Sequence, residues 1–153
     1  MTEAWTIDEF CSRVGQEIGV SDWTLVDQDR IQGFADLTED WAFVHVDAER
    51  ARAAGLDGTI AHGFLTIALI ATTVPTGLPR IKGVTLGFNY GFERLRLVAP
   101  VPAGGRIRSR FAVKECTERT PGEWRILYDV TMEIEGRDKP ALVAEWIIFY
   151  RIG

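Results

Sequence analysis

The chain has 153 residues, of which 46% are hydrophobic and 25% are charged, and its net charge is -5. This length predicts a single domain, residues 1–153, with a core large enough to fold without disulfides or metal. The composition excludes disordered and membrane-protein classes. The acidic balance excludes nucleic acid as a partner, because binding to a phosphate backbone needs a basic surface.

The start of the sequence lacks the basic and then apolar layout of a signal peptide, and no stretch approaches the roughly 20 apolar residues of a membrane span. We therefore expect a cytoplasmic protein with no membrane partner. Cys11 and Cys116 lie far apart and have no metal-binding spacing. Two separate thiols are expected, rather than a disulfide or a zinc site.

The first segment has the pattern of a helix. Thr6 followed by Glu9 is a capping box, and apolar residues then recur at helical spacing up to Gly19. After an apolar piece at 23–26, a second amphipathic helix is predicted from Asp27 to about Thr38. Its apolar positions are Ile31, Phe34 and Leu37.

The stretch FADLTEDWAFVHVDAERA, residues 34–51, passes from this helix into a loop. Asp47 can cap a further short helix through Ala54, which Gly55 is placed to end. The segment Ile60–Thr73 is apolar nearly all round, which predicts a helix buried on all sides and stopped by Pro75 and Gly77.

The rest of the chain alternates between apolar and polar residues, which is typical of strands. Glycine and proline divide it into strands expected at 81–92, 94–99, 105–118, 123–135 and 141–151. Short connections favour antiparallel pairing. The sequence therefore predicts an α+β fold in which an antiparallel sheet wraps around a central buried helix.

Residues 80–110 are locally basic, which allows two interpretations. The positive charges could bind a small anion, or they could belong to a solvated strand face whose acidic partners lie elsewhere in the sequence. The cations are Arg80, Lys82, Arg94, Arg96, Arg106, Arg108 and Arg110.

Both histidines of the chain lie in segments that could carry chemistry. Asp40 and His45 are either unrelated loop residues or an acid/base pair around one water, since imidazole titrates near neutral pH. Gly63 is at the start of the apolar helix, where free backbone N–H groups could stabilise negative charge on a carbonyl oxygen. The alternative is a glycine required only for helix packing.

Taken together, these segments resemble the MaoC-like or R-specific enoyl-CoA hydratases, whose signature is an aromatic residue, then Gly-Asp-x-Asn-Pro-aliphatic-His and a small residue. Here Phe34 to Thr38 are followed by Glu39-Asp40-Trp41-Ala42-Phe43-Val44-His45, with Ala51 beyond. The block Ile60-Ala61-His62-Gly63 and the stretch GFNYGFERLRLVAPVPAGGRIR also fit. The likeness is greatest to the branch of nodulation protein N-like dehydratases.

The resemblance implies a single hotdog domain that adds water to, or removes it from, an acyl-CoA or other acyl thioester. Asp40, His45 and the N–H of Gly63 would be catalytic, while Trp41, Phe43 and Asn89 are candidates for lining the substrate pocket or an interface. His62 either supports the helix start by packing or hydrogen bonding, or contacts the substrate. It also implies a homodimer and no metal or redox cofactor, with coenzyme A present only as part of the substrate. The arginines of the basic stretch would be candidates for binding the phosphates of coenzyme A.

Three residues depart from the signature: Glu39, Ala42 and Phe43 stand where it has Gly, Asn and Pro. A left-handed backbone at position 39 would cost on the order of 1 kcal/mol. Asp36 and Glu39 beside Asp40 could raise the pKa of whichever carboxyl is most buried. Two other functions stay open: an acyl-CoA thioesterase on the same fold, and a non-catalytic acyl-thioester-binding partner subunit.

Overall fold

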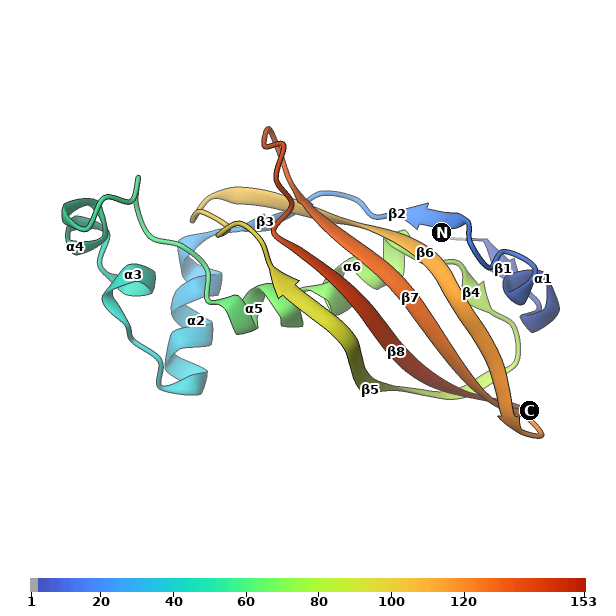
Figure 1. Ribbon diagram of the computed structural model, residues 1–153. Coiled ribbons are helices and arrows are strands. Elements are labelled where there is room, and N and C mark those ends of the chain that lie inside the picture. Colours follow the sequence, from blue (N-terminus) through green and yellow to red (C-terminus); the bar gives the residue numbers. More distant parts are fainter. Residues whose placement is uncertain (1–2) are drawn as a thin grey trace.

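The computed structural model describes residues 3–153. Short helices lie around a sheet of long strands (Figure 1). The helices are α1 (Ile7–Cys11), α2 (Gln28–Thr38), α3 (Phe43–Val46), α4 (Ala48–Ala53), α5 (Gly63–Ala68) and α6 (Ile70–Gly77). The strands are β1 (Ala4–Trp5), β2 (Glu17–Val20), β3 (Thr24–Val26), β4 (Arg80–Ile81), β5 (Val84–Leu97), β6 (Gly105–Thr120), β7 (Glu123–Ile134) and β8 (Leu142–Ile152).

Six strands form one sheet in the order β2-β6-β7-β8-β5, with β3 also pairing with β6. All of its pairings are antiparallel, as expected from the short connections. β1 and β4 form a separate parallel pair. The two strands expected at 81–92 and 94–99 are one strand, β5, whose register shifts between Asn89 and Gly91 and again between Phe92 and Arg94.

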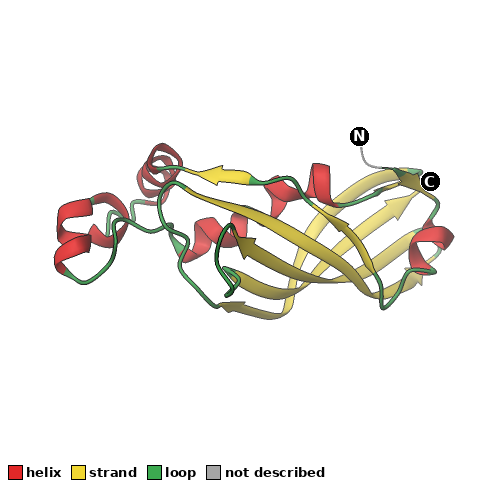
Figure 2. Cartoon of the chain, turned by 90° about the horizontal axis from the view of Figure 1, so that it is seen from above, coloured by secondary structure: helices red, strands yellow, loops and turns green. Residues whose placement is uncertain are grey.

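The core lies between the sheet and the helical pair α5–α6, which runs along one sheet face (Figure 1). The alternating residues of the β-strands supply it, as predicted, because successive side chains point to opposite faces. Ile126, Tyr128 and Met132 of β7 are at most 1% exposed. Helices α2, α3 and α4 gather at one end of the sheet (Figure 2). An antiparallel sheet wrapped around a central helix is thus confirmed.

The central helix begins later and ends later than predicted. Ile60 and Ala61 are extended instead, because Ile60 bridges to Pro102 and the Ala61 N–H donates to the Val101 carbonyl at 2.8 Å. Pro75 lies inside α6 rather than stopping it, and the helix continues to Gly77. The expectation of burial on all sides is wrong for the single chain: Phe64 is 79% exposed, and Ala68 and Ala71 on the same side are exposed too.

The first helix is also shorter than its apolar spacing predicts. The Thr6–Glu9 capping box is present, but α1 ends at Cys11. Ile18 belongs to β2, which pairs with the outer edge of β6. Backbone hydrogen bonds between residues 17–20 and the edge of β6 stabilise the strand more than a short segment stabilises a helix.

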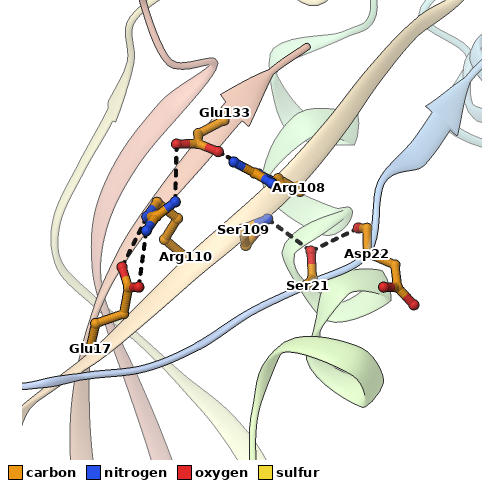
Figure 3. Close-up of polar contacts among 7 residues, drawn as sticks. All are labelled: Glu17, Ser21, Asp22, Arg108, Ser109, Arg110 and Glu133. Carbon is orange, nitrogen blue, oxygen red and sulfur yellow. Dashed lines mark hydrogen bonds and ion pairs between the residues drawn. The ribbon is translucent and has the colours of Figure 1, made fainter.

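Helix α6 packs closely against β2 and β6, and two glycines permit this. A Cβ on Gly19 would fall inside the Gly77 carbonyl, while one on Gly77 would lie 2.6 Å from the Phe111 ring. A polar seam continues the contact (Figure 3): the Ser109 N–H donates to Ser21 Oγ at 3.0 Å, and Ser21 Oγ donates to the Asp22 carbonyl.

The prediction of two separate thiols is wrong. Cys11 at the end of α1 and Cys116 on β6 form a disulfide with their Cα atoms 5.4 Å apart. Sequence spacing could not indicate this pairing, because the two residues meet only when α1 folds back over the sheet. The bond ties the N-terminal elements to the sheet across a sequence separation of 105 residues.

Removing this disulfide is expected to destabilise the protein. A closed loop of this length restricts the unfolded chain strongly, so Cys11→Ser should lower the free energy of unfolding by about 2–4 kcal/mol. Urea denaturation measures the change. The unmodified protein in reducing buffer should unfold like the variant, and equal midpoints with and without reductant in the unmodified protein would contradict the expectation.

No helix among residues 3–153 combines the length and the apolar character needed to cross a bilayer.

Candidate active site

The loop after α2 places Asp40 beside the start of the central helix. Helix α2 ends at Thr38 and is capped by Glu39, the only non-glycine residue with positive φ among the described residues (φ 59°, ψ 27°). This left-handed residue turns the chain so that the Asp40 N–H donates back to the Ala35 carbonyl at 3.1 Å. The Asp40 carboxylate is left exposed, with the Ala42 N–H donating to it at 3.3 Å.

His45 lies on the single turn α3 and is held at two points. Gln28 Nε2 donates to the His45 carbonyl at 2.8 Å, and His45 Nδ1 lies 2.8 Å from the Ile60 carbonyl. A carbonyl can only accept, so Nδ1 carries the hydrogen of this bond. In the neutral ring, Nε2 therefore carries the lone pair and is free to accept a proton.

Asp40, His45 and His62 converge: one potential ligand atom from each lies within 4.8 Å of the others. A water that makes hydrogen bonds of about 2.8 Å to two acceptors spans such a distance. The carboxylate of Asp40 and the free nitrogen of His45 are both acceptors, so one water between them can donate a hydrogen to each. This arrangement can polarise the water and receive its proton.

A pocket of about 280 Å³ opens next to His45. Gly63, the first residue of α5, lies in its wall next to Leu97 at the end of β5. The first N–H groups of a helix have no partner within the helix, and the Gly63 N–H has no acceptor among residues 3–153. The pocket is lined by His45, Ile60, Ala61, Gly63, Thr66, Leu97, Val98, Ala99 and Pro100.

The other residues predicted for the site do not line this pocket. Trp41 is half exposed and donates from Nε1 to Asp36 at 2.8 Å, while the Phe43 ring lies under the Arg50 guanidinium. His62 is buried behind His45. Asn89 lies eight residues along β5 from Leu97, which is roughly 26 Å in an extended strand.

The same cluster is the one place among the described residues where a metal could be considered. The nearby Asp47 is not part of it and caps α4, as expected, by accepting from the Arg50 N–H at 3.0 Å. The His45 and His62 rings are stacked, with centroids 3.8 Å apart. Nitrogens of two nearly parallel rings point side by side and do not converge on one ion at about 2.1 Å.

The idea that crowding raises a carboxyl pKa does not apply to Asp36. Its pKa lies below the ordinary value, because Trp41 donates a hydrogen bond to the carboxylate and Gln32 donates a second. Both bonds favour the charged form. Asp36 therefore supports the loop as an ionised acceptor.

Sequence reasoning missed two residues that shape the site. Gln28 holds the His45 backbone and also accepts a hydrogen bond from Thr59. Leu97 packs directly against Gly63 in the wall of the pocket. Neither residue belongs to a recognisable motif, and the Ile60 carbonyl that orients His45 is a backbone group that no side-chain pattern can reveal.

Most of the basic stretch belongs to ion pairs on the sheet. Arg110 pairs with Glu17 at 2.9 Å and lies 3.6 Å from Glu133, which also pairs with Arg108 (Figure 3). Arg94 and Arg106 approach Glu145 and Glu135. For these four arginines the structure bears out a solvated strand face with acidic partners elsewhere, and it does not favour a phosphate site.

Replacing Glu39 by glycine is expected to stabilise the protein. The left-handed backbone at this helix end costs a residue with a Cβ roughly 1 kcal/mol, and glycine avoids that cost. Glu39→Gly should therefore raise the free energy of unfolding by about that amount, measured by urea denaturation. Glu39→Ala, which removes the charge but keeps the Cβ, serves as the control and should show no such gain.

Known sequences match this chain over most of its length. A family profile described as "MaoC like domain" matches residues 9–133. Nodulation protein N of Rhizobium leguminosarum bv. viciae is 47% identical over 137 residues, which cover 89% of this chain and 85% of that protein. A 3-hydroxyacyl-thioester dehydratase Z of Mycobacterium tuberculosis is 38% identical over 145 residues, or 95% of each chain.

Solved structures confirm the hotdog fold. A monoamine oxidase regulatory protein from Archaeoglobus fulgidus superposes with a TM-score of 0.81 at 21% identity, covering 100% of this chain and 99% of that one. An (R)-hydratase from A. caviae superposes with a TM-score of 0.65 at 21% identity, covering 86% of this chain and 95% of that one.

Proposed function

Because the chain belongs to the MaoC-like dehydratase family and is a hydro-lyase, we propose that it adds water to the 2,3 double bond of an enoyl thioester, or removes it from the 3-hydroxyacyl form. Asp40, His45 and the Gly63 N–H would carry the reaction. The observation that supports this most is the placing of His45: its Nδ1 is held by the Ile60 carbonyl, which leaves Nε2 to accept a proton, and its ring lies near the Asp40 carboxylate and lines the pocket.

In the proposed step, a water O–H bond breaks as its proton passes to the Asp40/His45 pair, and the water oxygen bonds to C3. The C2=C3 π bond breaks and its electrons move toward the thioester oxygen; the pair then returns one proton to C2, and the thioester carbonyl forms again. Negative charge develops on the thioester oxygen, where a backbone N–H at a helix start can stabilise it. The Gly63 N–H is available for this, and the missing Cβ at Gly63 lets the Leu97 side chain pack beside it. The chemistry requires neither a metal nor a redox cofactor.

Coenzyme A is the proposed carrier of the acyl group. The R configuration of the 3-hydroxyacyl product is part of the proposal, since an (R)-hydratase shares the fold. Chiral analysis of 3-hydroxybutyryl-CoA formed from crotonyl-CoA measures the configuration.

The function is tested by following crotonyl-CoA with two assays side by side. Hydration removes the absorbance of the conjugated enoyl thioester and releases no thiol. Hydrolysis by a thioesterase would release free thiol from both crotonyl-CoA and butyryl-CoA. We expect loss of absorbance without thiol. Thiol release would identify a thioesterase, and binding of crotonyl-CoA without either change would identify a non-catalytic partner subunit.

A homodimer is the proposed assembly. Strand β5 pairs only with β8 among the described residues and is a long sheet edge (Figure 1), of the kind that proteins rarely leave uncovered. Tyr90 on this strand is 66% exposed, and Phe64 on α5 is 79% exposed. A second copy would cover both. Light scattering should therefore give a mass twice the 17.1 kDa of the chain, and a mass of 17.1 kDa would exclude the dimer.

A further inference from the structure

His62 is a buried polar residue at the junction of the loop and the central helix. It is 2% exposed and occupies the N-cap position of α5, directly before Gly63. Its side chain makes no capping hydrogen bond to the helix. The ring instead reaches the loop, where Nε2 lies 2.9 Å from the Asp40 carbonyl oxygen.

The contacts of the ring define its tautomer. The Asp40 carbonyl can only accept, so Nε2 carries the hydrogen. In the neutral ring the lone pair is then on Nδ1, which is buried and has no hydrogen-bond partner among the described residues. The one polar contact of the His62 side chain is therefore the bond that holds the Asp40 backbone.

The same ring also supports His45. The two imidazoles stack with centroids 3.8 Å apart and an angle of 25° between their planes, and Phe34 packs against His62 at 5.0 Å. Stacking limits tilting of the His45 ring, while the Nδ1 bond to the Ile60 carbonyl limits its rotation. These two restraints together fix the direction of His45 Nε2.

We infer that His62 is a positioning residue, an inference that rests on the proposed function: it fixes the Asp40 backbone by a hydrogen bond and the His45 ring by stacking. His62 thus orients both members of the pair toward one water, although its own side chain does not line the pocket. Of the two roles considered for His62 from the sequence, this is the supporting one, now with named contacts.

Three substitutions separate the two contacts. His62→Gln keeps an N–H donor near the position of Nε2 but loses the ring, His62→Phe keeps a ring but loses the donor, and His62→Leu loses both. We expect His62→Leu to lower kcat for crotonyl-CoA by about 100-fold, the order of effect that a displaced catalytic group produces. KM should stay within about threefold, because His62 is buried and does not line the pocket. His62→Gln and His62→Phe should recover part of kcat.

A second measurement does not depend on activity. The chain has only two histidines, so nitrogen NMR of each variant reports the His45 imidazole alone. In the unmodified protein His45 should show one fixed tautomer, with hydrogen on Nδ1. Loss of the stacking ring in His62→Gln or His62→Leu should move its nitrogen shifts toward the average of both tautomers, and His62→Phe should retain the fixed form.

Thr73→Val is the control for a general loss of stability, because it removes buried hydrogen bonds. Thr73 is buried on α6, where its hydroxyl donates to the Ile70 carbonyl and is hydrogen-bonded to Ser109 Oγ, away from His45. It should lower the melting temperature without changing the His45 signals.

Two results would overturn the positioning role: an unchanged His45 tautomer in both His62→Gln and His62→Leu, or a rise in KM with unchanged kcat. If the unmodified protein hydrates no enoyl thioester, the proposed function fails, while the nitrogen shifts still decide whether His62 orients His45.

Discussion

Replacing His45 by Gln or Asp40 by Asn is expected to lower kcat/KM for hydration of crotonyl-CoA by about 10²–10⁴-fold each, the usual contribution of a general acid or base. Gln retains size and polarity but cannot take the water proton that Nε2 is placed to accept. Asn keeps the shape of Asp40 and can still accept from the Ala42 N–H, so the loop should survive. Initial rates from the loss of enoyl absorbance measure both effects.

Glu39→Gln is the matched control for these variants. It removes the neighbouring negative charge while leaving the left-handed backbone as it is. Its kcat/KM should stay within about twofold, since exposed charges contribute little across solvent. If hydration survives both His45→Gln and Asp40→Asn, the pair is not the catalyst. If the double variant is no slower than either single one, the two groups act as one unit.

Gly63→Pro is expected to lower kcat by about 10²–10³-fold, the loss that follows removal of one oxyanion donor. Proline removes the N–H but suits the first residue of a helix. The preceding residue already has the extended backbone that proline requires, with His62 at φ -58° and ψ 142°. The helix should therefore still form, and circular dichroism checks this.

Gly63→Ala separates the added Cβ from the lost N–H. A Cβ at this position would lie 2.5 Å from Leu97 Cδ1, so this variant is best made together with Leu97→Val, which removes that methyl group. Gly63→Ala/Leu97→Val should retain most of kcat, whereas Gly63→Pro/Leu97→Val should not. Equal kcat in the two double variants would show that the N–H takes no part.

The sequence placed most elements of the fold, because their patterns are local. The alternation of β6 and β7 predicted strands whose inward residues are buried, and Asp27 and Asp47 cap the helices expected after them. The predicted element boundaries are wrong where a backbone segment forms hydrogen bonds with a segment that is distant in the sequence. Residues 17–20 leave a helical pattern to pair with β6, and residues 60–61 are drawn into contact with 101–102.

The candidate site, too, could be predicted only in part from the sequence. The types and order of Asp40, His45 and Gly63 could be recognised from the sequence, and so could the cost of a left-handed residue at Glu39. Their directions could not, because they depend on contacts across the fold: Gln28 to the His45 carbonyl, and His62 to the Asp40 carbonyl. Asn89, which belongs to a matching block, lies far from the pocket in the same chain.

The sequence by itself indicated the sheet through its apolar alternation and the family through its resemblance to a known signature, and it offered Asp40 and His45 as candidates for proton transfer. Only the tertiary structure decided which nitrogen of His45 is free, which ring supports it, and that Cys11 meets Cys116. The physical reason is that a hydrogen bond or a disulfide needs its partner within a few ångströms, and most of these partners come from segments that only folding brings together.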